Sequence, residues 1–418
     1  MRSATRLIYA TAIGLLSVGA APVTPPVATI GMDFLWRSGR YEAAELAALA
    51  APTDPLSKLV LAKADLFAGQ YLESQRLGTN AASGLTGDNK REALDGAARA
   101  AFLRGDNVNA SRLGRLACAG VVGWPQSWEG ADLFCKRFPS GFLTQLGGFR
   151  FPRELTAKHA TPFLGSRPTV AASFGAYSSS AFLDTGSEAS VIEARDAANL
   201  GVKVTEYTTR VTGFTDQPLT VKLGVLPKAQ LAGWELRQLP VIVLPDVFPV
   251  GALPSPFILG VNELTPFRAS FDWQARLFTL TAHQSSPSAV GSRVLTGRGA
   301  GLAGPNLRAK LTVGGKALWI TPDTGSTRLL LSQASLQRAG INVPGSGGNS
   351  AVAGVTGKLD VMESALQSPF TLLGKTFPSA AFGLAPSLPE GADGIAGTEL
   401  IFSGRLIIDL QSALAVIE

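Results

Sequence analysis

A four-residue sequence occurs twice in this chain, and the landmarks after each copy keep the same order and spacing. The two copies are Asp184-Thr185-Gly186-Ser187 and Asp323-Thr324-Gly325-Ser326. Each is followed, at offsets that agree within two residues, by a glycine, a turn-like glycine, an apolar pair with glycine, and an aspartate. In that order these are Gly201 and Gly340, Gly213 and Gly354, Ile258-Leu259-Gly260 and Ile395-Ala396-Gly397, and Asp272 and Asp409. Landmarks in register over this length predict two copies of one folding unit.

The chain around both copies has the texture of β structure. Short β-branched runs are punctuated by turn residues, and the chain holds 46 Gly and 26 Pro. This pattern is typical of short strands joined by tight turns. We expect one all-β unit at 161–284 and a second at 306–418, with 285–305 connecting them.

The first part of the chain predicts helices instead. Over 27–120, apolar residues recur at helical spacing among good helix formers. A short motif ends at Gly39, Gly69 and Gly105, at spacings of 30 and 36 residues. That spacing resembles degenerate tetratricopeptide repeats, which would offer a groove to a protein partner; an ordinary helical bundle is the alternative. The Gly-, Pro- and aromatic-rich residues 121–160 are interpreted as an irregular connection.

Residues 1–26 have the pattern of an export signal. Arg2 and Arg6 precede the apolar stretch from Leu7 to Ala20, which is too short to span a bilayer comfortably. We expect cleavage near Ala21, no stable membrane span, and a periplasmic or secreted protein. An uncleaved signal would instead anchor the chain to the membrane.

The two cysteines, Cys118 and Cys135, would then reach an oxidising compartment. A disulfide between them and two buried free thiols both remain open at this stage.

Composition excludes several classes of site. The only histidines are His159 and His283, so a His-rich zinc site is excluded, and no metal or cofactor is expected. The net charge of +6 is spread among acids rather than gathered in a basic block, which argues against nucleic acid as a partner. Gly374-Lys375-Thr376 lacks the first glycine of a phosphate loop, because Pro369 stands there.

The duplicated pattern resembles the retropepsin-like aspartic peptidases, and two copies in one chain are similar to pepsin-like enzymes. In that family an apolar strand leads into Asp-Thr-Gly, and a later apolar-apolar-Gly segment crosses beneath it. Phe182-Leu183-Asp184 and Ile258-Leu259-Gly260 fit this pattern. Pro322 and Ala396 depart from it in the second copy. The resemblance implies a multidomain chain, all-α first, then an all-β bilobal acid-protease fold.

The resemblance also implies a site. Asp184 and Asp323 would share one proton and activate a water that attacks a peptide bond. Thr185 and Thr324 would lock the lobes together, Gly186 and Gly325 would permit the turn, and the hydroxyls of Ser187 and Ser326 would hydrogen-bond the carboxylates. Hairpins around Gly213, Phe214 and Gly354 would cover the substrate, which is a peptide or protein.

Two other interpretations compete with this one. A single Asp-Thr-Gly can be a plain turn, since Asp and Gly favour turns for their own reasons. A duplicated pair can also keep the fold and lose the chemistry. The chain would then be a peptide-binding or scaffold protein that uses the acid-protease fold and the helices.

Overall fold

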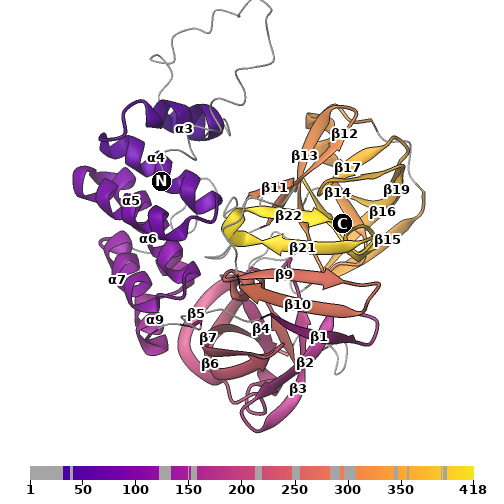
Figure 1. Ribbon diagram of the computed structural model, residues 1–418, viewed down its shortest axis with the longest axis horizontal. Helices are drawn as coiled ribbons and strands as arrows, with labels where there is room; N and C mark the ends of the chain where they lie inside the picture. Colours follow the sequence, from indigo (N-terminus) through magenta and orange to yellow (C-terminus); the bar gives the residue numbers. More distant parts are fainter. Residues whose placement is uncertain are drawn as a thin grey trace, which may run out of the picture.

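The computed structural model describes residues 32–37, 41–121, 133–148, 150–151, 158–211, 219–246, 255–282, 292–295, 307–342, 347–354, 357–386, 388 and 393–418. The expected export signal at 1–26, the first motif glycine Gly39, and the hairpin residues Gly213 and Phe214 lie outside these ranges. A helical region comes first and a β-rich region follows it, which confirms the order expected from the sequence (Figure 1).

The helices of the first part pack against one another in chain order, as the indigo-to-purple stack of Figure 1 shows. They are α2 (Met32–Arg37), α3 (Tyr41–Leu49), α4 (Pro55–Phe67), α5 (Tyr71–Gly84), α6 (Gly87–Leu103) and α7 (Asn107–Cys118). Asp54 and Asp106 accept backbone amides at the starts of α4 and α7, which satisfies donors that a helix start leaves free. Gly69 and Gly105 follow the ends of α4 and α6 with φ of 72° and 78°. Only glycine adopts this left-handed conformation without strain, so both helices end where the sequence motif predicts.

The connection expected to be irregular contains two short helices. They are α8 (Phe134–Arg137) and α9 (Ser140–Leu146). Phe134, Phe138 and Phe142 stand four residues apart and are buried against one another and against Phe102 of α6. This aromatic spacing extends the helical region beyond residue 120. Cys118 and Cys135 form a disulfide between α7 and α8, which decides between the two alternatives left open by the sequence.

The first group of strands closes into a barrel. Its members are β1 (His159–Leu164), β2 (Thr169–Phe174), β3 (Tyr177–Leu183), β4 (Ser190–Glu193), β5 (Lys203–Val211), β6 (Leu219–Leu231), β7 (Trp234–Leu244), β8 (Phe257–Leu259), β9 (Phe267–Asp272) and β10 (Leu277–Ala282). Strand pairings run β2–β3–β8–β4–β7–β6 and return to β2. Closure leaves these six strands without a free edge.

The second group repeats the central pairings of the first. It comprises β12 (Arg308–Val313), β13 (Lys316–Pro322), β14 (Leu329–Ser332), α10 (Gln333–Arg338), β15 (Asn349–Gly354), β16 (Gly357–Leu366), β17 (Phe370–Leu372), β18 (Lys375–Phe377), β19 (Ala380–Ala385), β20 (Gly394–Ala396), α11 (Thr398–Ile401), β21 (Arg405–Asp409) and β22 (Leu414–Ile417). β13 pairs with β20 in parallel, as β3 does with β8, and β14 pairs with β20 and β19 as β4 does with β8 and β7.

One hairpin in each group has the same kind of turn. Ala232-Gly233 joins β6 to β7, and Leu373-Gly374 joins β17 to β18. The φ angles are 47° and 78° in the first turn and 51° and 81° in the second. Two left-handed residues in a row form the turn whose twist matches that of the flanking strands.

A further sheet joins the two groups. Its order is β1–β10–β9–β21–β22–β11, where β11 (Ser292–Leu295) comes from the segment expected to be a plain connection. At its centre β9 of the first group pairs with β21 of the second, visible at the middle of Figure 1. One apolar cluster runs from the first group through this sheet into the second, so the β-rich region has a common core.

Candidate functional site

Each aspartate of the repeated sequence stands immediately after a strand. Asp184 follows β3, and its amide donates to the carbonyl of Leu259 on β8 at 3.0 Å. Asp323 follows β13, and its amide donates to Ala396 on β20 at 2.9 Å. The parallel pairing of these strands therefore fixes both aspartates in the same backbone setting.

The apolar-apolar-Gly segments cross beneath the turns that follow. Val261 donates to the carbonyl of Ser187 at 2.8 Å, and Thr398 donates to that of Ser326 at 2.9 Å. A Cβ atom on Gly260 would lie 2.3 Å from the carbonyl carbon of Ala189. One on Gly397 would lie 2.3 Å from the amide nitrogen of Arg328. Both crossings are so close that only glycine fits.

Thr185 and Thr324 exchange hydrogen bonds across the two halves. The amide of Thr185 donates to Thr324 Oγ1 at 2.9 Å, and the amide of Thr324 donates to Thr185 Oγ1 at 3.0 Å. Each hydroxyl also donates to the carbonyl before the opposite aspartate, at Pro322 and Leu183. Both threonines are buried, so these four bonds replace water and tie the two aspartate turns together.

Backbone amides hold one oxygen of each carboxyl group. Gly186 and Ser187 donate to Asp184 Oδ1 at 2.9 and 3.2 Å. Gly325 and Ser326 donate to Asp323 Oδ1 at 2.7 and 3.2 Å. The turn that glycine permits points these amides back at the carboxyl groups.

The serine hydroxyls do not act as the sequence analysis expected. Ser187 Oγ donates to the carbonyl of Ala189 at 2.8 Å, and Ser326 Oγ donates to that of Arg328 at 3.3 Å. A hydroxyl can donate one hydrogen bond, and here it donates to the carbonyl two residues later in the chain. The serines therefore reach the carboxyl groups through their amides.

Each carboxyl group lies against the turn that carries the other, because Gly186 faces Asp323 and Gly325 faces Asp184 with no room for a side chain between them. Burial raises the pKa of Asp184, while its hydrogen bond with Asp323 and the turn amides work against that rise. Burial, followed by the charge of Asp184 and the hydrogen bond to it, raises the pKa of Asp323 well above the usual range. Both residues keep part of their surface exposed, so water reaches them. The pKa of Asp323 is raised further than that of Asp184, so Asp323 is the carboxyl group of the two that holds a proton more readily.

Pro322 fits the strand that it ends. The corresponding residue of the first half, Leu183, donates its amide to Pro168 at 2.8 Å. Proline cannot make that bond, but its carbonyl receives the hydroxyl of Thr185. Proline at the position equivalent to Leu183 therefore removes one hydrogen bond at a strand end and keeps the hydrogen bond between the halves.

A small pocket lies beside Asp323. Its lining includes Phe182, Thr324 and Gly325 together with Arg167, Trp273 and Phe402. The sequence analysis did not single out the last three, because they come from segments distant in the chain. The rings of Trp273 and Phe402 stack at 4.8 Å in its wall.

A charged cluster that the sequence analysis also missed joins the turn after Asp323 to the β15–β16 hairpin, which is called the second hairpin below. Arg328 pairs with Glu363 of β16 and donates to Ser350 of β15 at 3.2 Å, and Ser350 also donates to Glu363. Gly354 ends β15 and pairs with Gly357 across the same hairpin. The sequence held one sign of this cluster, because the two copies of the repeat differ five residues after the aspartate. Ala189 stands there in the first copy and Arg328 in the second.

Among the described side chains, no group of three His, Cys, Asp or Glu residues is arranged to hold a metal ion. In the same ranges, no helix is long and apolar enough to cross a membrane.

Comparison with protein families matches residues 170–262 to the aspartyl protease family. The match runs from β2 through Asp184 to the crossing segment after Gly260, so this part of the chain is similar to an aspartyl protease domain. A search of curated proteins found no match to the sequence.

Proposed function

We propose that the chain is an aspartic endopeptidase in which Asp184 and Asp323 act as a pair on one water molecule. The observation that carries the proposal is that the exchanged threonine bonds bring the two aspartate turns face to face, with each turn glycine against the opposite carboxyl group. The raised pKa values of Asp184 and Asp323 agree with that proximity. An acid and a base of the same residue type are available together only when the environment separates their pKa values. The repeated pairings favour a bilobal acid-protease fold of the retropepsin or pepsin kind.

The proton balance assigns the roles. Ionised Asp184 takes a proton from water as the water oxygen attacks the peptide carbonyl carbon, and Asp323 gives its proton to the carbonyl oxygen. The resulting diol collapses when Asp184 passes its proton to the nitrogen, the C–N bond breaks, and Asp323 recovers a proton from a hydroxyl. Each carboxyl group ends as it began, so two carboxyl groups and water suffice.

The hairpins are proposed to border the substrate cleft. β5–β6 leads to Gly213 and Phe214, and β15–β16 carries Gly354, at matching offsets from the two aspartates. The substrate is proposed to be a peptide or protein segment that lies between them.

Export is part of the proposal. The apolar stretch from Leu7 to Ala20 favours a periplasmic or secreted protein, and the disulfide between Cys118 and Cys135 suits an oxidising compartment. Mass spectrometry of the native protein should find a chain that begins near Ala21. A cytoplasmic chain that still carries Met1 would contradict export.

The catalytic proposal is tested with a peptide library. Asp184→Asn and Asp323→Asn should each lower kcat/KM by about 10³-fold or more, and the double variant should be scarcely worse, because the two groups act as a unit. Asn preserves shape and cannot ionise. Full activity in either single variant, with the fold intact by circular dichroism, would sink the single-chain pair. Wild-type protein that binds peptides without cleaving any would favour a scaffold.

A further inference from the structure

The β5–β6 hairpin of the first barrel lies against the two short helices α8 and α9. Arg137 of α8 donates from Nη1 to the carbonyl of Arg210 on β5. The ring of Phe142 on α9 meets that of Tyr207 edge-on, with centroids 6.2 Å apart. A Cβ atom on Gly141 would lie 2.3 Å from Tyr207 Oη, so the backbone of α9 contacts the side chain of this β5 residue. The hairpin is therefore seated on the helical region by a hydrogen bond and by close packing.

Apolar packing continues from these helices toward Asp184. One buried cluster contains Phe138 and Phe142 of the helical region, Val211 and Val221 of the hairpin, and Val191 of β4. Val191 stands seven residues after Asp184. A displacement of the hairpin would open this cluster and expose apolar surface next to the aspartate turn.

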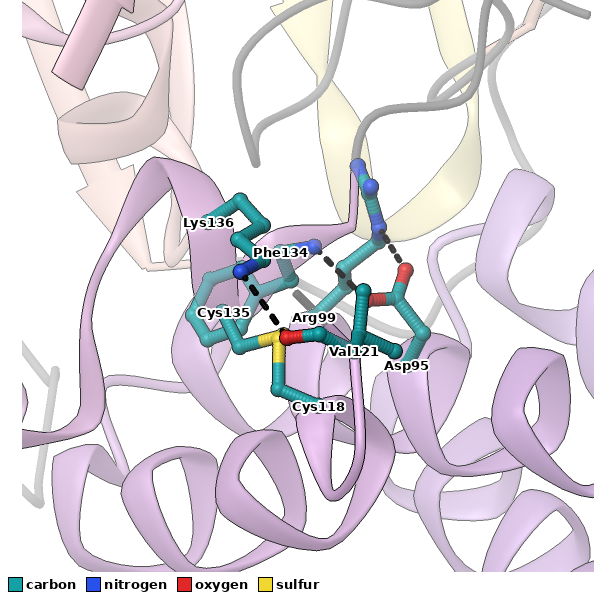
Figure 2. The surroundings of a disulfide bond; sticks show 7 residues. All are labelled: Asp95, Arg99, Cys118, Val121, Phe134, Cys135 and Lys136. Atoms are coloured by element: carbon teal, nitrogen blue, oxygen red, sulfur yellow. Dashed lines mark hydrogen bonds and ion pairs between the residues drawn. A yellow bond between two sulfur atoms is a disulfide. The ribbon is translucent and has the colours of Figure 1, made fainter. Parts of the chain in front are cut away.

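Several bonds fix α8 to the rest of the helical region (Figure 2). The disulfide from Cys118 holds Cys135, and Asp95 of α6 accepts the amide of Phe134 at 2.6 Å. Lys136 donates to the carbonyl of Val121 at 3.3 Å. Arg137 is 2% exposed, so its guanidinium is presented to β5 from a buried and covalently held helix. A buried cation keeps its position because moving it would leave acceptors and donors unmatched.

The second hairpin is held from inside its own half. There Arg328 comes from the turn after Asp323 and reaches Glu363 and Ser350 on the two hairpin strands. The first half has Ala189 at the position of Arg328, and that alanine is 2% exposed. The first hairpin thus contacts Arg137 of the helical region, whereas the second contacts Arg328 of its own half.

We propose that α8 and α9 are the support that holds the β5–β6 hairpin against the buried cluster that leads toward Asp184, with Arg137 as its positioning residue. The Cys118–Cys135 disulfide fixes the helix that carries Arg137. This proposal rests on the proposed function, in which the hairpin borders the substrate cleft. Arg137 contacts no substrate and acts through the carbonyl of Arg210. The helical region is accordingly an integral part of the peptidase rather than a detachable partner-binding module.

The test uses the full chain and measures the hairpin directly. In Arg137→Met, and separately in Cys118→Ser/Cys135→Ser, amide hydrogen exchange over 203–211 and 219–225 should be about tenfold faster, as expected for the loss of one charge-assisted hydrogen bond or of its anchor. Arg112→Met is the matched control, because exposed Arg112 hydrogen-bonds Asn109 one turn away on its own helix, and exchange over the hairpin strands should match wild type. Arg137→Lys keeps a buried donor and should restore part of the protection.

Peptide cleavage supplies the second readout. Arg137→Met should raise KM about tenfold and change kcat less, because the paired carboxyl groups remain in place. Wild-type exchange over both strands in the arginine and the disulfide variants would overturn the support. If Arg137→Met does not fold, Arg137→Lys and the disulfide variant decide.

The two proposals fail in different ways. A wild-type chain that cleaves no peptide, while exchange rises in the variants, removes the peptidase and upholds the support. Variants with wild-type exchange and wild-type KM remove the support and leave the peptidase standing.

Discussion

A Cβ atom added to Gly186 would lie 2.4 Å from Asp323 Cγ, and one added to Gly325 would lie 2.6 Å from Asp184 Oδ1. Each glycine of the repeated sequence thus faces the carboxyl group of the opposite half. Gly186→Ala and Gly325→Ala should each force the two carboxyl groups apart and lower kcat/KM by about 10²-fold or more, as small displacements of catalytic groups do. Steady-state kinetics with a peptide substrate checks this. Gly201→Ala is a useful comparison, since a Cβ there meets nothing within 4 Å and any effect should fall on stability through its φ of 70°. Equal activity losses in all three variants would contradict the steric argument.

The raised pKa of Asp323 predicts how stability changes with pH. The folded protein binds this proton more tightly than the unfolded chain, so the contribution is fully present below the ordinary value of 3.8 and is lost as pH rises through the folded pKa. Each pKa unit of the shift corresponds to about 1.4 kcal/mol. Asp323→Asn, which cannot ionise, should therefore be more stable than wild type at neutral pH, with the difference shrinking toward pH 4. Urea unfolding over a pH series measures it. A wild type that gains on the variant as pH rises would show that the pKa of Asp323 is lowered instead.

Because Thr185 and Thr324 exchange hydrogen bonds, removing the Thr185 hydroxyl should destabilise the protein, and a residue that keeps the hydroxyl should restore its stability. Thr185→Val is close to isosteric and leaves the buried amide of Thr324 and the carbonyl of Pro322 without partners. Each unsatisfied buried group costs about 1–3 kcal/mol, so the loss of partners for both should lower the free energy of unfolding by about 2–6 kcal/mol. Thr185→Ser retains the hydroxyl and should recover most of it. Chemical denaturation compares the three proteins, and a Ser variant as unstable as the Val variant would show that the hydroxyl alone does not account for the loss.

A buried ion pair links the helical region to the segment beneath Asp184. Arg150, fully buried against the ring of Phe102, pairs with Glu263 at 3.1 Å, three residues after Gly260. Arg150→Met leaves the Glu263 carboxylate buried alone and should cost about 3–5 kcal/mol.

Adding Glu263→Met to that variant should recover much of the loss, because an apolar pair of similar size has no charge to desolvate. Arg91→Met is the control, since Arg91 pairs with Asp88 at the surface and should contribute about 1 kcal/mol or less. Thermal unfolding provides the comparison. Additive losses in the double variant would mean that the two side chains act independently.

The sequence predicted those parts of the fold that depend on local chemistry. Gly69 and Gly105 end helices because the left-handed conformation there excludes other residues. The spacing of Asp184 and Asp323 to Gly260 and Gly397 reflects crossings too close for a side chain. Such constraints recur in both copies and are therefore visible as a repeated pattern.

Contacts between distant segments left no comparable signal. Arg150 and Glu263 lie 113 residues apart. Arg150 precedes both copies of the repeat, and Glu263 is not repeated three residues after Gly397, where Leu400 stands. The helices α8 and α9 were hidden because their short aromatic spacing lies among glycines and prolines that favour irregular structure. The serine hydroxyls were misassigned because their nearest acceptor is a carbonyl whose position follows only from the folded turn.

The register of β9 against β21 bears on how such a chain arose. Asp272 pairs with Arg405 and Arg268 with Asp409, with Ser270 opposite Ile407 at the centre. Asp272 is equivalent to Asp409, since each ends its strand, and Arg268 is equivalent to Arg405. When every residue is replaced by its equivalent in the other strand, the same pairs result. This is the register in which one strand pairs with a second copy of itself about a twofold axis. A single ancestral half could therefore have assembled as a homodimer through this strand. Gene duplication and fusion would then have left the interface in place while freeing Ala189 and Arg328 to diverge.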